Sequence, residues 1–334
     1  METRKKRIFS GVKPSGDLTL GNYLGAIKNW ATLQEEYECF YSIVDLHAIT
    51  VKQEPAELRK RTLEILAIYI ASGIDPEKCT LFIQSHVPAH SEASWLLTCI
   101  TNMGELSRMT QYKDKTAKVK DNEAISSGLF NYPVLMTADI LLYQADAVPV
   151  GVDQKQHVEL ARDIAQRFNS MYSDTFVLPD VIVPKEAAKI MDLQDPSRKM
   201  SKSDDNPNSF ILIMDKPEVI RKKISRAVTD SIGVVNYTDE QPGVKNLVNI
   251  LCALKGYKPD EVVEMFNGKG YADFKAAVAD ALVDEFTPVQ AKVRELLSEK
   301  SKLEEIYKKG AERASYEAQK TLRKMQKKIG LVPR

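Results

Sequence analysis

The sequence has little of what a disulfide-linked, zinc-binding or membrane protein requires. Its four cysteines, Cys39, Cys79, Cys99 and Cys252, are scattered and form no CxxC pair. That spacing argues against a disulfide framework or a zinc site and fits free thiols in a reducing cytoplasm. No apolar run approaches the ~20 residues of a membrane span, and the basic N-terminus METRKKRIFSG lacks the apolar part of a secretory signal. We therefore expect a cytoplasmic protein without membrane attachment.

An excess of charge of one sign is also lacking, since the formal net charge of the 334 residues is only +1. The chain as a whole is therefore not drawn to nucleic acid. Local basic clusters occur at 113–120, at 221–226, and near the C-terminus at Lys320, Arg323, Lys324, Lys327 and Lys328. Each cluster is either a solvated surface or a contact with RNA.

The first part of the chain alternates short β-type runs with helical patterns. Strands are expected at 8–12, 39–44, 80–84 and 147–150, and finally at 177–178 and 181–183. This alternation predicts an α/β fold with a doubly wound parallel sheet of the Rossmann type. A polar, basic segment at about 103–128 interrupts the alternation, and we interpret it as an insertion.

The β signal largely ends beyond Pro217. Helices are expected at 217–228, 242–255, 259–266, 271–286 and 288 to about 327, with a break near Ser301. The change of pattern predicts two domains, a Rossmann-type domain over 1–200 and, over 201–334, a helical domain with a long C-terminal helix.

The helix expected to begin at Pro133 carries the most unusual residue of the chain. Tyr132, Met136, Asp139 and Tyr143 share one stripe, while the other faces are apolar, so the helix is expected to be buried. Burying a carboxylate is costly unless charge or hydrogen bonds compensate. Asp139 is therefore either held by a nearby arginine or by backbone donors, or it accepts from the N–H group of a ligand.

Two loops have residues suited to phosphate. The first strand is followed by a turn, Pro14–Gly16, and by a helix that Thr19 or Asp17 is expected to cap. Strand, small-residue loop and helix N-terminus together form an anion site, although a plain turn is the alternative. The string KMSKS at 199–203 lies between turn formers and predicts an exposed loop whose two lysines reach a polyphosphate.

These motifs carry a resemblance to a known family. TLGN at 19–22 resembles the HIGH signature of class I aminoacyl-tRNA synthetases, in the form that their tryptophan-specific branch uses, and 199–203 is the KMSKS signature verbatim. VDLHAIT at 44–50, YPVLMTADILLY at 132–143 and GVDQKQH at 151–157 resemble the same branch. The likeness extends over essentially the whole chain, but both histidines of the generic signature are absent.

The resemblance implies a ligase that activates L-tryptophan with ATP and transfers it to the 3′-terminal ribose of tRNA(Trp). It implies Mg²⁺ carried by the ATP phosphates, no protein metal site, an anticodon-binding helical domain and a homodimer. The alternatives are the tyrosine-specific branch, a non-catalytic RNA-binding paralogue, and an adenylyltransferase of the wider superfamily.

The resemblance also implies roles for residues. Asp139 would accept from the indole N–H, and Gln154 would hold the polar end of the amino acid. The walls of the indole slot would be Phe9, Tyr132, Met136, Val148 and Val150. The ATP site would be lined by Lys13, Pro14, Ser15, Gly21 and Asn22, and its adenine and ribose part by Gly151, Val152, Asp153 and Ile190. The loop that closes over the phosphates would be Lys199, Met200, Ser201, Lys202 and Ser203.

Within that loop, Lys199 and Lys202 would be the catalytic cations, and Lys113 or Lys115 would assist them. Lys13 stands where relatives often have glutamine. The histidines receive no catalytic role: His47, His86 and His90 are interpreted as packing or surface residues, and no role follows for His157.

Overall fold

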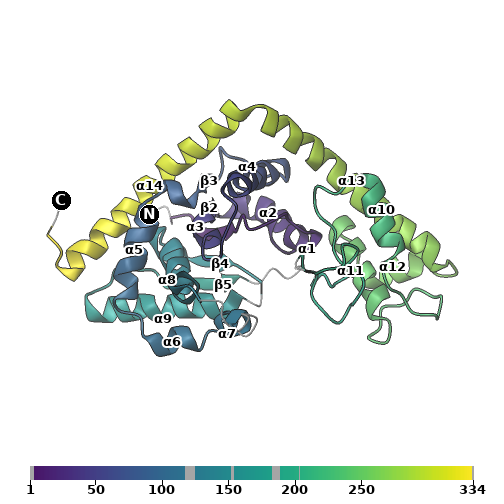
Figure 1. Ribbon diagram of the computed structural model, residues 1–334, viewed down its shortest axis with the longest axis horizontal. Coiled ribbons are helices and arrows are strands. Elements are labelled where there is room, and N and C mark those ends of the chain that lie inside the picture. The colour runs from purple at the N-terminus through teal and green to yellow at the C-terminus, as the bar shows by residue number, and fades with distance from the viewer. Residues whose placement is uncertain (1–3, 117–124, 152–153, 183–188, 203, 333–334) are drawn as a thin grey trace.

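A single parallel sheet forms the centre of the computed structural model, which describes residues 4–116, 125–151, 154–182, 189–202 and 204–332 (Figure 1). Its strands are β1 (Arg7–Val12), β2 (Glu38–Ile43), β3 (Thr80–Ile83), β4 (Ala147–Pro149) and β5 (Asp180–Ile182). Their order across the sheet is β3-β2-β1-β4-β5. From β1 the chain adds β2 and β3 on one side, and it then returns to add β4 and β5 on the other side of β1. Sheets of this kind bind ligands at such a switch point, here between β1 and β4. The predicted fold class is confirmed.

One predicted strand is wrong. Residues 177–178 belong to no strand, and the Val177 amide donates to the side chain of Gln144, at 2.9 Å, instead of to a neighbouring strand. Val183 lies outside the described residues.

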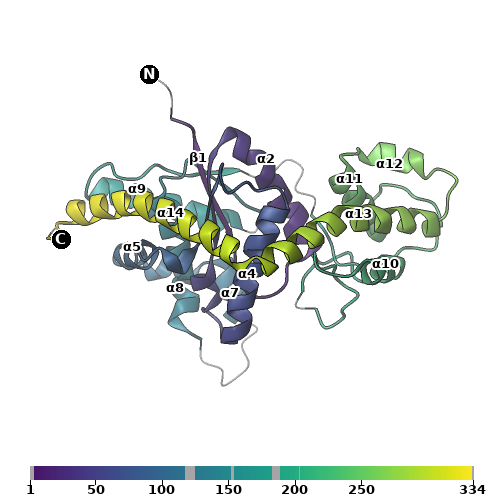
Figure 2. The same cartoon turned by 90° about the horizontal axis from the view of Figure 1, so that it is seen from above.

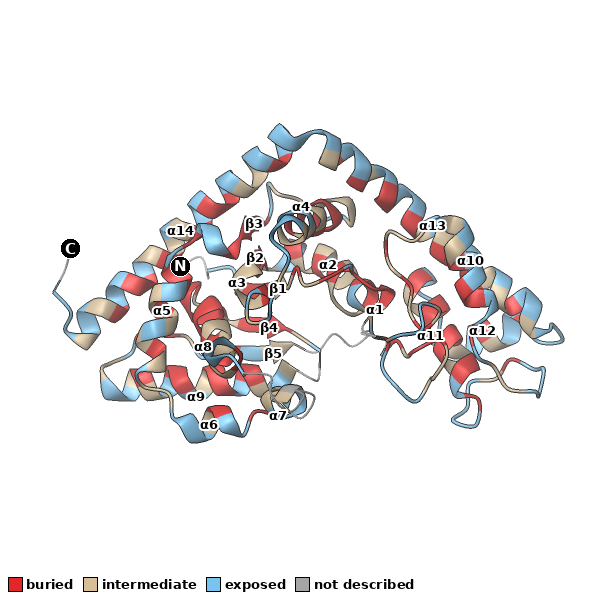
Figure 3. Ribbon diagram, viewed as in Figure 1, coloured by how far each residue is buried: buried red, intermediate tan, exposed pale blue. Residues whose placement is uncertain are grey.

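Helices cover both faces of the sheet. Ile8 of β1 packs into the apolar cluster under α2 (Lys28–Glu36) and α4 (Pro55–Ala71). Phe9, on the opposite face, packs into the cluster under α8 (Ser127–Leu142) and α9 (Lys155–Met171). Because both faces are covered, the central strands are buried almost throughout (Figure 3).

Shorter helices complete this part of the chain. They are α1 (Leu20–Asn22), the π-helical turn η1 (Tyr23–Ile27), α3 (Asp45–Ala48), the 3₁₀ turn η2 (Gln84–His86), α5 (Ala89–Thr98), α6 (Met103–Ser107) and α7 (Thr110–Thr116). The segment interpreted as an insertion therefore contains α6 and α7.

Helix α8 begins two turns earlier than predicted. Ser126 caps it, because its hydroxyl oxygen accepts from the Leu129 amide at 3.2 Å. Pro133 thus lies inside the helix, and the placement of this proline at the first helical position is wrong. The proline lacks only one N–H of the helical ladder, and the packing of a nearly all-apolar helix offsets that loss.

The C-terminal helices are α10 (Pro217–Ser225), α11 (Pro242–Lys255), α12 (Pro259–Met265), α13 (Tyr271–Ser298) and α14 (Lys300–Ile329). Prolines open three of them, where the missing N–H costs nothing. The predicted break before Pro288 is wrong, since α13 continues through this residue, whereas the break near Ser301 occurs at Glu299. None of the helices described here could cross a membrane.

Helices α13 and α14 form a long angled span, and α14 returns to the sheet and lies over its β3 edge (Figures 1 and 2). The approach is closest at Gly310, where an added Cβ atom would lie 1.7 Å from the Leu81 carbonyl oxygen. Since an exposed edge strand can pair with other chains, α14 protects this edge.

Candidate active site

The turn after β1 is shaped by Gly16 and by the cap of α1. Gly16 has a φ of 146°, a conformation that favours glycine. Thr19 caps α1: its hydroxyl oxygen accepts from the Asn22 amide at 3.3 Å, and Asn22 Oδ1 accepts from the Thr19 amide at 3.0 Å. The predicted cap at Thr19 is confirmed. The Leu20 amide donates to the Ile211 carbonyl at 2.8 Å, so this turn is tied to the segment after the KMSKS loop.

The space beside Gly21 is open. A Cβ atom at Gly21 would meet only Thr19 Oγ1 at 3.5 Å and Ile190 Cβ at 3.9 Å. The structure therefore brings together Gly21, Asn22 and Ile190, which the resemblance assigns to the nucleotide.

The KMSKS loop lies on the same turn. The Met200 amide donates to the Ile190 carbonyl at 3.1 Å, and Lys199 pairs with Met191 in an antiparallel bridge. The Lys202 side chain lies over Gly16, where a Cβ atom would be 2.6 Å from Nζ. Two segments almost two hundred residues apart thus form one site.

The charges of this site favour an anion. Burial lowers the pKa of Lys202, and the neighbouring positive charge of Lys13 lowers it further. Burial also lowers the pKa of Lys13. Two ammonium groups that repel each other and are partly removed from water are stabilised by a phosphate placed beside them.

Asp139 is 1% exposed, and three side chains hold its carboxylate. His90 Nδ1 and Gln84 Nε2 donate to Oδ1 at 2.6 Å and 2.7 Å, and His47 Nε2 donates to Oδ2 at 2.7 Å. Burial by itself would raise the pKa of Asp139, but the contacts with His47 and His90 outweigh burial and hold it below its ordinary value. The carboxylate is therefore ionised, and its partners are not arginines.

The interpretation of His47 and His90 as packing or surface residues is incomplete, because both also hydrogen-bond to Asp139. His47 lies on α3 directly after β2, Gln84 begins η2 directly after β3, and His90 lies on α5. Polar residues that directly follow strands gather at the carboxyl edge of a parallel sheet, and that signal could have found them in the sequence. His86 is exposed, as expected.

The hydrogen bonds leave room for one more donor on Asp139. A carboxylate offers about four acceptor positions, two on each oxygen. Oδ1 already receives two donors, whereas Oδ2 receives one, His47, from the described residues. The remaining position on Oδ2 suits the N–H group of a ligand.

Half-buried apolar side chains lie on the same stripe of α8. Tyr132 and Met136 are only partly covered, in contrast to the fully buried Leu141. The Tyr132 hydroxyl lies 2.9 Å from His157 Nε2, and burial raises the pKa of Tyr132 to about 12. His157 thus has a contact that the sequence did not indicate.

The other predicted wall residues belong to the cluster on this face of the sheet. Phe9 and Val148 are buried in it, and Met136 and Val150 pack against it while partly covered. Phe9, Met136, Val148 and Val150 therefore lie on the same face of the sheet.

Several predicted residues cannot be placed. Val152, Asp153 and Ser203 lie outside the described residues, as does the side chain of Lys115. Helix α9 begins at Lys155, with Gln154 before it, and Lys113 is exposed on α7. Among the residues that the structure places, no group of three histidine, cysteine or acidic side chains could hold a metal ion.

A doubly wound sheet with a helix N-terminus, a basic loop and an ionised buried carboxylate at one edge defines a nucleotide-dependent class of enzyme. Residues 1–287 match the family model of the class I tRNA synthetases for tryptophan and tyrosine. A curated tryptophan–tRNA ligase of Clostridium perfringens is 76% identical over 334 residues, with 100% of both chains covered.

Two solved structures are also similar. Tryptophanyl-tRNA synthetase from Mycoplasma pneumoniae has a TM-score of 0.92 at 38% identity, with 98% of each chain covered. The enzyme from Campylobacter jejuni, complexed with ADP and tryptophan, has a TM-score of 0.83 at 38% identity, covering 97% of this chain and 100% of its own. The chain belongs to the class I aminoacyl-tRNA synthetases, in the family specific for tryptophan and tyrosine.

Proposed function

We propose that the chain is a tryptophan–tRNA ligase. It activates L-tryptophan with ATP and transfers the tryptophanyl group to the 3′-terminal ribose of tRNA(Trp). The observation that carries the proposal is the buried carboxylate of Asp139, which His47, Gln84 and His90 hold by hydrogen bonds. The same chain has Lys202 over the Gly16 turn. The similar chain from Campylobacter jejuni, complexed with ADP and tryptophan, supports it.

In the first step, a carboxylate oxygen of tryptophan attacks the α-phosphorus of ATP. The bond from this phosphorus to the bridging oxygen breaks, and pyrophosphate leaves with the electron pair. Lys13, Lys199 and Lys202 stabilise the negative charge that develops on the phosphate oxygens. The loop also lowers the activation barrier by aligning the tryptophan carboxylate with the α-phosphorus. Mg²⁺ carried by the phosphates adds positive charge, and we propose no protein ligand for it.

Tryptophan is selected by a hydrogen bond and by shape. Asp139 Oδ2 accepts from the indole N–H, and a substrate without that donor leaves a buried charge incompletely paired. The indole ring lies among Phe9, Tyr132, Met136, Val148 and Val150, and Gln154 holds the polar end of the amino acid.

The nucleotide lies along the two loops. Lys13, Pro14, Ser15, Gly21 and Asn22 line the phosphate and sugar side. Gly151, Val152, Asp153 and Ile190 meet adenine and ribose. Lys199, Met200, Ser201, Lys202 and Ser203 close over the phosphates, with assistance from Lys113 or Lys115.

The larger organisation is part of the proposal. Residues 1–200 form the catalytic domain, and 201–334 bind the anticodon. We also propose a homodimer, which is supported by Trp95 on α5 and Met103 on α6, side chains that are 68% and 74% exposed on successive helices. The cytoplasm is its expected location, because its tRNA product is used there.

The test is exchange of labelled pyrophosphate into ATP with each of the twenty amino acids in turn. Only tryptophan should support rapid exchange, whereas exchange with tyrosine would favour the alternative branch. Asp139→Asn should lower the exchange with tryptophan by more than tenfold, because a hydrogen bond to a charged group contributes ~1.5–3 kcal/mol. Asp163→Asn, on the exposed face of α9, is the control. Unchanged exchange in Asp139→Asn would contradict the assignment of Asp139.

A further inference from the structure

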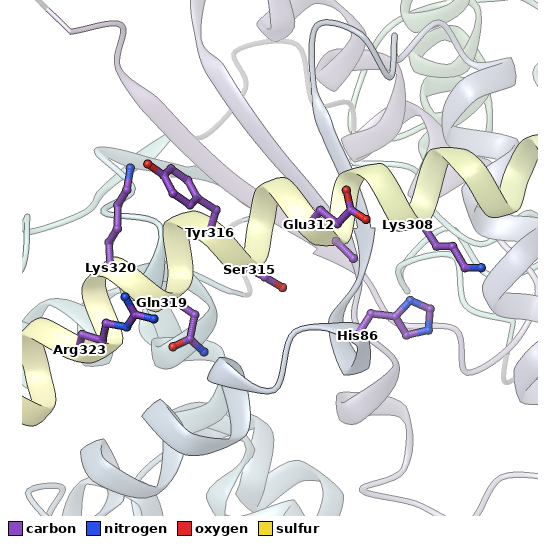
Figure 4. Close-up of a pocket in the computed structure, with 9 residues that line it drawn as sticks. His86, Lys308, Glu312, Ser315, Tyr316, Gln319, Lys320 and Arg323 are labelled. Carbon is purple, nitrogen blue, oxygen red and sulfur yellow. The ribbon is translucent and has the colours of Figure 1, made fainter. Parts of the chain in front are cut away.

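A groove of about 630 Å³ follows α14 on the side that faces the segment after β3 (Figure 4). His86, from η2, lies at one wall, and Ser315, Gln319 and Arg323 come from α14. The groove contains none of the residues assigned to tryptophan or ATP. Its role is therefore separate from the adenylation chemistry.

The charge of α14 is unlike that of the chain as a whole. Between residues 308 and 328 the helix has eight lysines and arginines and two glutamates, a net charge of +6, whereas the whole chain has +1. Lys308, Lys320 and Arg323 line the groove, opposed there by Glu312. The groove is therefore complementary to a polyanion.

The cations in the groove are available to a ligand. Among the described residues, Lys308 and Lys320 pair with glutamates of their own helix, Glu304 and Glu317. The first pair is exposed and contributes little, and Glu317 has a second partner, Arg7, at 3.0 Å. Arg323 pairs with no carboxylate in the part of the chain that the structure describes. A phosphate can displace or join these partners at small cost.

An exposed aromatic ring lies among these charges. Tyr316 is 65% exposed, and Lys320 Nζ lies 3.9 Å from the centre of its ring. A flat ring beside cations is a surface on which bases and sugars of RNA stack while their phosphates are neutralised. An acidic peptide would use the cations but would gain nothing from the ring's flat face.

The position of the groove relates it to the amino-acid site. His86 is two residues beyond Gln84, whose side chain donates to Asp139. The groove therefore begins near the carboxyl edge of the sheet, where the 3′ end of a tRNA must arrive, and continues along α14.

We propose that this groove binds the sugar–phosphate backbone of the tRNA, with Lys308, Lys320 and Arg323 on phosphates and Tyr316 under a base or ribose. The inference rests on the proposed function, since it takes the partner to be the tRNA substrate. Contacts of this kind position the RNA and carry no base sequence.

The test is a pair of double variants that remove the same charge from the same helix. Lys320→Gln with Arg323→Gln removes two cations of the groove. Lys302→Gln with Lys309→Gln removes two exposed cations from another part of α14, outside the groove, and is the matched control. Direct tRNA binding is measured by fluorescence anisotropy at several salt concentrations, and aminoacylation and tRNA-free pyrophosphate exchange are measured alongside.

The groove variant should bind tRNA at least fivefold more weakly, and the slope of its affinity against salt should fall by about 2. Tyr316→Ala should weaken binding without changing that slope. Pyrophosphate exchange by the groove variant should stay within twofold of that by the unaltered protein. If the unaltered protein itself showed no exchange with tryptophan, the proposed function would be contradicted, whereas the groove proposal is judged by tRNA binding. The groove proposal is overturned if groove and control variants bind tRNA alike, or if polyglutamate displaces tRNA as well as a second RNA does.

Discussion

At the scale of single residues, a chain of hydrogen bonds holds the carboxylate of Asp139 in place. His90 contacts Asp139 through Nδ1 and the Tyr143 hydroxyl through Nε2, at 2.6 Å and 2.8 Å. The Tyr143 ring stacks against Phe9 and Phe40, with centroid distances of 5.6 Å and 4.6 Å. Burial raises the pKa of Tyr143, so its hydroxyl keeps its proton. The orientation of Asp139 is thus determined by rigid neighbours.

This series of hydrogen bonds predicts that His90 acts as a positioning residue for Asp139. His90→Gln should raise KM for tryptophan roughly tenfold, because a hydrogen bond to a charged group contributes ~1.5–3 kcal/mol. KM for benzothienylalanine, in which sulfur replaces the indole N–H, should change less than twofold. Tyr143→Phe keeps the stacked ring and should give a smaller change of the same kind. Equal changes with both amino acids would indicate that His90 is only structural.

The two lysines of the phosphate site predict a pH dependence. In the proposed site the charged form of Lys202 binds phosphate, and the pKa of Lys202 is lowered by burial and then by Lys13. Activity should therefore fall on the alkaline side at a lower pH than an ordinary lysine, with a pKa of about 10.4, would give. Lys13→Gln removes the like charge, so the pKa of Lys202 rises and the alkaline limit moves to higher pH.

The measurement is kcat/KM for ATP in pyrophosphate exchange between pH 7 and 10.5. Lys202→Arg, which stays charged throughout this range, is the control and should shift the limit further up. A limit that stays in place or moves down in Lys13→Gln would show that the two ammonium groups do not interact.

At the scale of elements, α14 stabilises the sheet by closing its β3 edge. No side chain fits between helix and strand at Gly310, since an added Cβ atom would meet the Leu81 carbonyl. The helix backbone therefore lies directly on the strand, and the residues around it bury an apolar stripe, including Leu303, Ala314 and Leu322. A helix this polar on its outer face is held by that contact (Figure 3).

Gly310→Ala should lower the free energy of unfolding by about 2 kcal/mol, because overpacking forces the backbones apart. Chemical denaturation monitored by circular dichroism measures the change. Gly25→Ala is the control: nothing lies within 4 Å of its added Cβ atom, and alanine is the better helix former. A Gly310→Ala variant as stable as the parent would mean that α14 does not press on β3.

At the scale of the whole molecule, α13 and α14 connect the helical region around α10, α11 and α12 with the sheet (Figure 2). This span joins the proposed catalytic and anticodon-binding parts, and the groove of α14 lies along it. The positive charge of this span is confined to α14, because α13 has three lysines and arginines against five acidic residues. The proposed phosphate contacts along the span therefore lie on α14.

The proposed dimer predicts that the unaltered protein sediments at twice the mass of one chain. Trp95→Glu with Met103→Glu should yield monomers, since charges at the centre of an apolar interface are costly to desolvate. Tyr257→Glu, between α11 and α12, is the control and should leave the mass unchanged. A monomer at micromolar concentration in the unaltered protein would contradict the dimer. Sedimentation velocity distinguishes these outcomes.

The helices and strands were largely predictable because their signals are local. Three prolines and a capping Thr19 mark helix starts through contacts within one turn. Pro133 and Pro288 were misplaced for the opposite reason, since packing from distant residues keeps both helices intact around a proline.

The site was predictable only in part. Asp139 and the KMSKS lysines stand out by chemistry: a carboxylate in an apolar helix, and two lysines within five residues. His47, Gln84 and His90 are 92, 55 and 49 residues from Asp139, and each looks ordinary in its own segment.

The sequence by itself determined the class of fold, the two loops that we propose bind phosphate, and the unusual acid, because each depends on residues that are neighbours along the chain. Only the tertiary structure decided which side chains hold that acid, that Lys202 lies over Gly16, and that α14 lies along the β3 edge. The physical reason is that parallel strands bring the residues that follow them to one edge, whatever their separation in sequence.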